Sequence, residues 1–133
     1  MRPLRDAVRA GLIAAVVSGA PSTIHALATG RDPLEATYAA GSLLLPGERR
    51  RGVLLAAAIP VHLGISVGWA VLLAVVLPRR RTVLAGAAAG LAIAALDLGI
   101  VGRRFERIRV LPVGPQLADH IAYGAVVGAA LRK

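Results

Sequence analysis

Long apolar blocks alternate with arginine clusters along this chain, and this alternation limits what the chain can fold into. The apolar blocks cover about residues 7–29, 52–77, 82–102 and 116–131. A helix of about 20 apolar residues crosses a hydrocarbon layer of about 30 Å, and water-facing loops of membrane proteins are rich in Lys and Arg. We therefore predict an all-α integral membrane protein, a four-helix bundle in which residues 1–133 form one transmembrane domain.

Composition supports the membrane class and argues against nucleic acid as the partner of the basic residues. Hydrophobic residues make up 56% of the chain, above the ~45–50% of soluble domains. The net charge is +9, but the arginines flank apolar blocks and form no basic face with stacking aromatics. Membrane lipid headgroups are the expected counterions. The chain has no cysteine, which excludes disulfides and thiolate metal sites.

A shorter apolar stretch lies between the first two blocks, and we predict an interfacial or re-entrant helix over about residues 33–45. Asp32 suits the position before a helix, Pro33 its first position and Glu35 its first turn, because unpaired amides there favour negative charge. Pro46 and Gly47 would end it. The alternative is a fifth span, which would place the two termini on opposite sides of the membrane.

Small residues spaced four apart recur in every block, and this spacing lets helix backbones approach closely in lipid. Such close approach favours a tightly packed bundle. The first block has Gly11, Ala15 and Gly19, and the later blocks have the pairs Gly64 and Gly68, Gly86 and Gly90, and Gly124 and Gly128.

Polar residues within the blocks gather in one half of the predicted bundle. In an up-down-up-down arrangement the first and third spans end, and the second and fourth begin, at the same membrane face. That face would hold a polar cluster, since inward-facing polar groups in lipid need partners. Its members are Ser22, His25, His62, Ser66, Asp97, Asp119 and His120.

Helical phase predicts that Asp97 and His120 approach each other inside the bundle. At about 100° per residue, Asp97 lies near the angle of Gly86 and Gly90, and His120 near that of Gly124. A pair of this kind would respond to pH near neutrality.

Simpler interpretations of the polar residues stand beside this one. The histidines could be hydrogen-bonded residues at the membrane interface, and Asp97 could pair with Arg103 or Arg104 along its own helix.

Orientation rests on the first span, because the arginine count is tied between the two faces. We predict a bacterial inner (plasma) membrane location with both termini cytoplasmic, since the flank of the first span often dominates. The terminal face has Arg2, Arg5, Arg9, Arg79, Arg80, Arg81, Arg132 and Lys133, and the other face has Arg31, Arg49, Arg50, Arg51, Arg103, Arg104, Arg107 and Arg109.

The stretches "PSTIHALATGRDPLEA", "PVHLGISVGWA" and "DHIAYGAVVG" resemble a family of small, uncharacterised four-span membrane proteins of high-GC bacteria. The resemblance implies the fold alone. It carries no activity and no catalytic residues.

The sequence is compatible with three classes of function. The first is a noncatalytic accessory subunit or homo-oligomer, whose partners are lipid, further copies of the chain or a larger membrane complex. The second is a component for proton or small-solute transport that uses the histidines and Asp97 as relay groups. The third is a protein that binds haem or a divalent metal, although the histidines lack a recognisable metal spacing and no cofactor is predicted. No catalytic residue is predicted, and nothing indicates a hydrolase.

Overall fold

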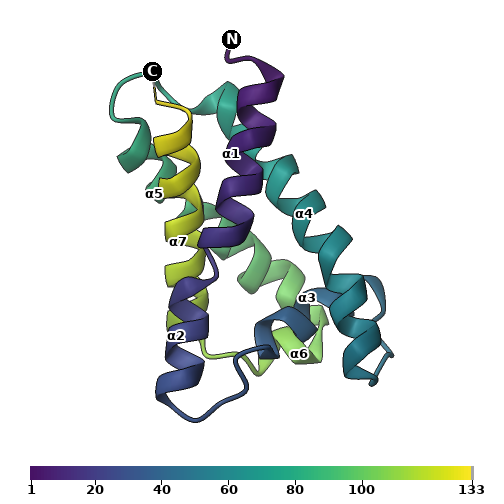
Figure 1. Cartoon of the computed structure of the whole chain (residues 1–133). Helices are drawn as coiled ribbons and strands as arrows, with labels where there is room; N and C mark the ends of the chain where they lie inside the picture. The colour runs from purple at the N-terminus through teal and green to yellow at the C-terminus, as the bar shows by residue number, and fades with distance from the viewer. Residues whose placement is uncertain (133) are drawn as a thin grey trace.

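The computed structural model describes residues 1–132, and all of its regular elements are helical (Figure 1). The prediction of an all-α fold is confirmed. The elements are α1 (Leu4–Val17), α2 (Ala20–Ala28), α3 (Glu35–Leu44), α4 (Arg51–Val76), α5 (Thr82–Leu96), the π-helical turn η1 (Asp97–Val101), the 3-10 turn η2 (Gly102–Arg104), α6 (Glu106–Arg109) and α7 (Val113–Ala130).

Three helical stretches within the described residues are long and apolar enough to cross a membrane. They are Leu4–Ala28, Arg51–Val76 and Thr82–Arg104, and they match the first three predicted spans. The fourth predicted span, about 116–131, corresponds to α7, which begins three residues earlier and is not among these stretches. Gln116, Asp119 and His120 in its first half lower its hydropathy.

The two termini lie at one end of the molecule, and the helices diverge toward the other end (Figure 1). α7 packs against α5, α1 and α2, while α4 packs against α1 and α3 and has few contacts with α7. At the terminal end, alanines of α1 such as Ala10 and Ala14 bury against Leu73 of α4 and Val127 of α7. The molecule is therefore closed at the terminal end and splayed at the other.

The first predicted span is broken into two helices. α1 ends at Val17, and α2 begins at Ala20 with Pro21 in its first turn. Proline has no N–H and its ring crowds the preceding turn, so a straight helix cannot continue through it without losing a hydrogen bond. The prediction of one continuous helix over 7–29 is therefore corrected to a helix pair that meets at Ser18 and Gly19.

Glycines bring α5 and α7 into backbone contact. A Cβ added at Gly86 would overlap the carbonyl of Gly124, and one added at Gly90 would overlap the carbonyl of His120. Gly124 and Gly128 are confined in the same way by the backbone of α5. Only residues without a side chain allow this approach, which brings the start of α7 close to the end of α5.

The other glycine spacings differ from expectation. A Cβ at Gly64, Gly68 or Gly19 would meet nothing within 4 Å, so the predicted packing role of these three residues is wrong for contacts within this chain. α1 instead uses Gly11, where a Cβ would lie 2.9 Å from the Cα of Val67. Spacing identifies a smooth helix face, but it does not show whether another helix of the same chain covers that face.

The short helix between the first two spans is present as α3, but it begins later than predicted. Its N-cap position is Leu34, and Asp32 Oδ1 accepts a hydrogen bond from the Leu34 amide at 2.9 Å without capping the helix itself. α3 has 10 residues, which at 1.5 Å per residue is about half of a bilayer crossing. It lies along α4, and Arg51 stacks on the Tyr38 ring at 5.5 Å.

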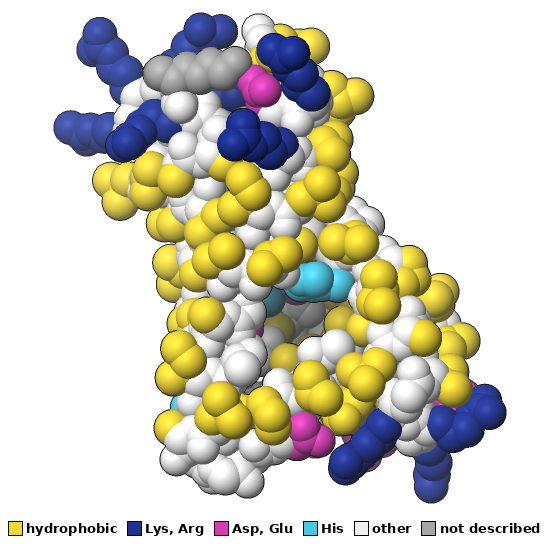
Figure 2. Space-filling model, viewed as in Figure 1, with side chains coloured by type: hydrophobic (Ala, Val, Ile, Leu, Met, Phe, Trp, Pro, Cys, Tyr) yellow, Lys and Arg dark blue, Asp and Glu magenta, His cyan; other side chains and the backbone are white. Residues whose placement is uncertain are grey.

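Charged residues gather at the two ends of the molecule, and yellow hydrophobic side chains cover the surface between them (Figure 2). At the terminal end, the Arg2 guanidinium donates to the carbonyls of Leu77 after α4 and Leu131 after α7, at 2.9 and 3.3 Å. A cation there complements the negative ends of both helix dipoles. At the other end Arg50 donates to Glu48, and these bonds lower the pKa of Glu48 to about 2.

Candidate functional site

A cavity of about 460 Å³ occupies the splayed half of the molecule. It lies between α2 and α7 on one side and α3, α4 and α6 on the other, and its lining comes from all of these elements and from α1, α5 and η1. Figure 2 shows the molecule hollowed on its side, between the two arginine-bearing ends and among hydrophobic side chains. The cavity therefore opens laterally, through the apolar belt.

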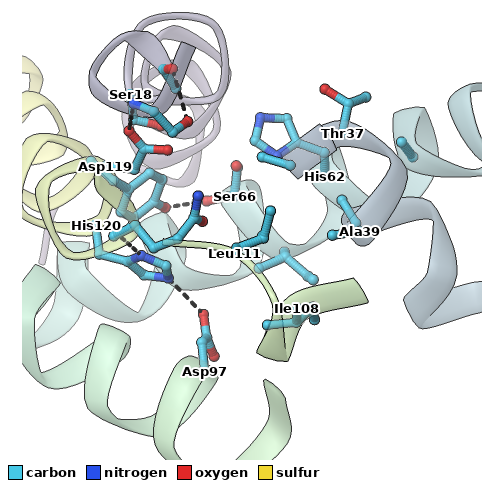
Figure 3. A pocket seen from close by; sticks show the side chains of 18 of the residues that line it. Ser18, Thr37, Ala39, His62, Ser66, Asp97, Ile108, Leu111, Asp119 and His120 are labelled. Carbon is cyan, nitrogen blue, oxygen red and sulfur yellow. Dashed lines mark hydrogen bonds and ion pairs between the residues drawn. The ribbon is translucent and has the colours of Figure 1, made fainter. Parts of the chain in front are cut away.

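Asp97 and His120 form an ion pair in this cavity (Figure 3). His120 Nε2 lies 3.3 Å from Asp97 Oδ2, and the two side chains are 19% and 30% exposed. Their approach, predicted from helical phase, is confirmed. Asp97 begins the π-helical turn η1, in which the Gly102 amide bonds to the Asp97 carbonyl. Turns of this type often occur at functional sites.

The hydrogen bonds of His120 determine how many protons the pair holds. His120 Nδ1 lies 2.7 Å from the Gln116 carbonyl oxygen, which can only accept, so Nδ1 carries a hydrogen. Nε2 faces a carboxylate oxygen of Asp97, and a proton must lie between these two atoms for a hydrogen bond to form. Whether that proton resides on His120 or on Asp97, the pair is neutral overall.

Asp119 connects α7 to the start of α2. Its Oδ1 accepts a hydrogen bond from the Ser22 amide at 2.8 Å, and Ser22 is in the first turn of α2. The first amides of a helix have no partner within the helix, and α2 has no side-chain cap of its own. A carboxylate from a different helix therefore caps α2 and fixes it against α7.

His62 and Tyr123 connect α4 to its neighbours across the cavity. His62 Nε2 donates to the Ala15 carbonyl at 2.7 Å. His62 is an exposed residue that also lines the cavity. The buried Tyr123 hydroxyl donates to the Ser66 carbonyl. Ser66 itself is 4% exposed and lines the cavity. These contacts mark the inner limit of the cavity, next to the apolar core of the terminal end.

His25 does not join the other members of the predicted polar cluster. It is partly exposed on α2 and lies outside the cavity lining, whereas Ser22, one turn earlier, is buried in it. The break at Ser18 and Gly19 changes the helical phase between α1 and α2. Ser22 and His25 both lie on α2, but of the two only Ser22 is on the face that lines the cavity.

The alternative pairing of Asp97 with Arg103 or Arg104 is not seen, because the ion-pair partner of Asp97 is His120. Metal ligation gains no support either. Among residues 1–132, no three side chains of the metal-ligating types His, Cys, Asp and Glu converge as a metal site.

Several lining residues were missed by the sequence analysis. They include Thr37 and its neighbours on α3, Ile108 of α6 and Leu111 before α7 (Figure 3). The short α6 was not predicted, since four residues carry too little periodicity to detect. Pro21 was a usable signal for the break that gives Asp119 its role, because proline is common in the first turn of a helix.

No protein-family model, curated protein or solved structure matches this chain.

Proposed function

We propose that this protein is a noncatalytic binding protein of the bacterial inner membrane that takes up a small amphiphilic molecule from the bilayer. In this proposal α7 is a fourth span that completes a four-helix bundle. The protein acts as an accessory subunit or as a homo-oligomer within the membrane, with lipid as its immediate surroundings.

The observation that carries the proposal is the lateral cavity with a two-sided lining. Its volume of about 460 Å³ lies within the ~300–1,000 Å³ range of ligand pockets. Carboxylate and imidazole groups of Asp97, Asp119 and His120 line one wall, whereas Leu98, Val101 and other apolar side chains line the rest. A molecule with a polar head and an apolar tail satisfies both kinds of lining.

The polar side chains are engaged in contacts that hold helices together, which favours binding over catalysis. Asp119 caps α2, His62 donates to α1, and Tyr123 donates to α4. Both ring nitrogens of His120 face acceptors, so neither is free to take a proton from a substrate without rearrangement.

Transport of protons or a small solute is the alternative, and it requires a path through the terminal half. In this conformation Ala10, Ala14, Leu73 and Val127 pack together beyond Tyr123. A transporter would have to open this apolar layer, whereas a binding protein uses the cavity as it is.

The orientation proposed is that both termini face the cytoplasm. They lie at the same end of the molecule (Figure 1), as an even number of spans requires. Reaction of a cysteine introduced at the N-terminus with an impermeant reagent outside intact cells would reverse this assignment.

The expected result for the binding function is photolabelling of the cavity by a neutral amphiphile. A long-chain alcohol that carries a diazirine, added to the protein in lipid nanodiscs, should crosslink to cavity residues such as Leu98 and Val101, as mapped by mass spectrometry of peptides. Ala40→Trp should remove most of this labelling, because Ala40 lines the cavity from α3 and the indole would fill it.

The matched control is Ala88→Trp, since Ala88 is exposed on α5 and lies outside the cavity. It should leave cavity labelling unchanged. Labelling spread evenly over the outer faces of the helices, with no loss in Ala40→Trp, would contradict a binding function.

A further inference from the structure

The charge of the cavity is opposite to that of the protein as a whole. The chain has a net charge of +9, yet of the described residues that line the cavity none is a lysine or arginine. The ionisable carboxylates and imidazoles there are Asp97, Asp119, His62 and His120. The balance among these four groups sets the charge that a ligand would meet.

Asp97 and His120 together contribute no net charge in the arrangement seen. Asp97 and His120 share one proton and are neutral as a pair, because both nitrogens of His120 face acceptors. His62 Nε2 donates to the Ala15 carbonyl. Asp119 is a second carboxylate of the cavity and lies outside this pair.

Asp119 is placed to share its charge with a ligand. Its Oδ1 accepts from the Ser22 amide, so the group that it contacts belongs to a neutral residue of α2 and not to a cationic side chain. The helix N-terminus that it caps offsets part of the charge, but a carboxylate has capacity for further donors. Trp69 also lines the cavity, and its indole is the ring type that binds ammonium groups best.

We propose that the cavity selects amphiphiles with a cationic amine head group, which the Asp119 carboxylate binds while the tail lies against the apolar wall. This inference rests on the proposed binding function and adds the ligand class to it. The Coulomb attraction between a carboxylate and a cation is larger in surroundings of low dielectric than in water.

The test compares three photoreactive probes with the same diazirine-bearing decyl tail, which end in a primary amine, an alcohol or a phosphate. Cavity crosslinking is measured against probe concentration in nanodiscs of neutral lipid. The amine should half-saturate the cavity at a concentration about tenfold lower than the alcohol does, because the amine gains one charge-assisted hydrogen bond. The phosphate should bind more weakly than either.

Asp119→Asn separates the charge from the structural role of this residue. Asparagine keeps an oxygen for the Ser22 amide, so α2 stays capped. The variant should lose the roughly tenfold preference for the amine and keep its affinity for the alcohol. The control Glu106→Gln removes an exposed carboxylate outside the cavity and should leave the preference intact.

Each outcome decides between the two proposals. Equal affinity for amine and alcohol, tighter binding of the phosphate, or an amine preference that survives Asp119→Asn overturns the cationic ligand class but leaves the binding function. Absence of cavity crosslinking by all three probes overturns the binding function itself.

Discussion

Replacing Gly124 with valine is expected to prevent α5 from packing against α7 and to unfold the part of the bundle that these two helices form. A Cβ at Gly124 would overlap the Gly86 carbonyl and approach the Gly90 backbone. Backbone atoms cannot move aside as a side-chain tip can, so the free energy of unfolding should fall by about 3 kcal/mol or more, the upper range for overpacking. Helix loss measured by circular dichroism during titration with a denaturing detergent would give this value.

Gly68→Val is the matched control, because Gly68 lies on a helix like Gly124 but a Cβ there would meet nothing within 4 Å. The control should unfold at the same detergent fraction as the original protein. Equal destabilisation by the two substitutions would mean that the valine side chain, and not the contact between α5 and α7, is responsible.

Asp97→Ala is expected to destabilise the bundle by about 2 kcal/mol, because it leaves His120 Nε2 without its partner in a partly buried position. Asp97→Asn should lower the free energy of unfolding by less than about 1 kcal/mol, since its amide N–H can donate a hydrogen bond to Nε2 of the neutral imidazole. The same detergent titration measures both. Equal losses in the two variants would show that the contact between Asp97 and His120 does not contribute to stability.

The contact between Asp97 and His120 was predictable because two independent regularities agree on it. Asp97 lies where the third predicted span ends and His120 where the fourth begins, at the same end of the bundle, and both have the helical phase of glycines that pack against another helix. Helical phase is reliable along an unbroken helix, and His120 is about one turn from Gly124 while Asp97 is about two turns from Gly90.

His25 shows where the same reasoning fails. Its depth in the first predicted span placed it with the polar cluster, but depth does not tell which face of α2 it occupies, and it lies outside the lining of the cavity. The role of Asp119 was missed because of the break between α1 and α2, since a straight helix would have had no free amide at Ser22 for it to cap.

The sequence also could not show that Gly64 and Gly68 would be exposed. Their spacing equals that of Gly86 and Gly90, and only the divergence of α4 from α7 leaves them uncovered. The cavity has the same origin, since it lies between helices that separate toward one end. Such divergence depends on the crossing of whole helices and leaves no local pattern in the residues.

Uptake of an amphiphile into the cavity is tested most directly by protection of a thiol placed inside it. The chain has no cysteine, so Thr37→Cys provides a single thiol on the cavity wall, and Val113→Cys provides an exposed one outside it. Decylamine at about ten times its dissociation constant should slow alkylation of Thr37→Cys by N-ethylmaleimide about tenfold, and leave the rate for Val113→Cys unchanged. Equal rates for Thr37→Cys with and without decylamine, at concentrations up to the solubility limit, would contradict the account.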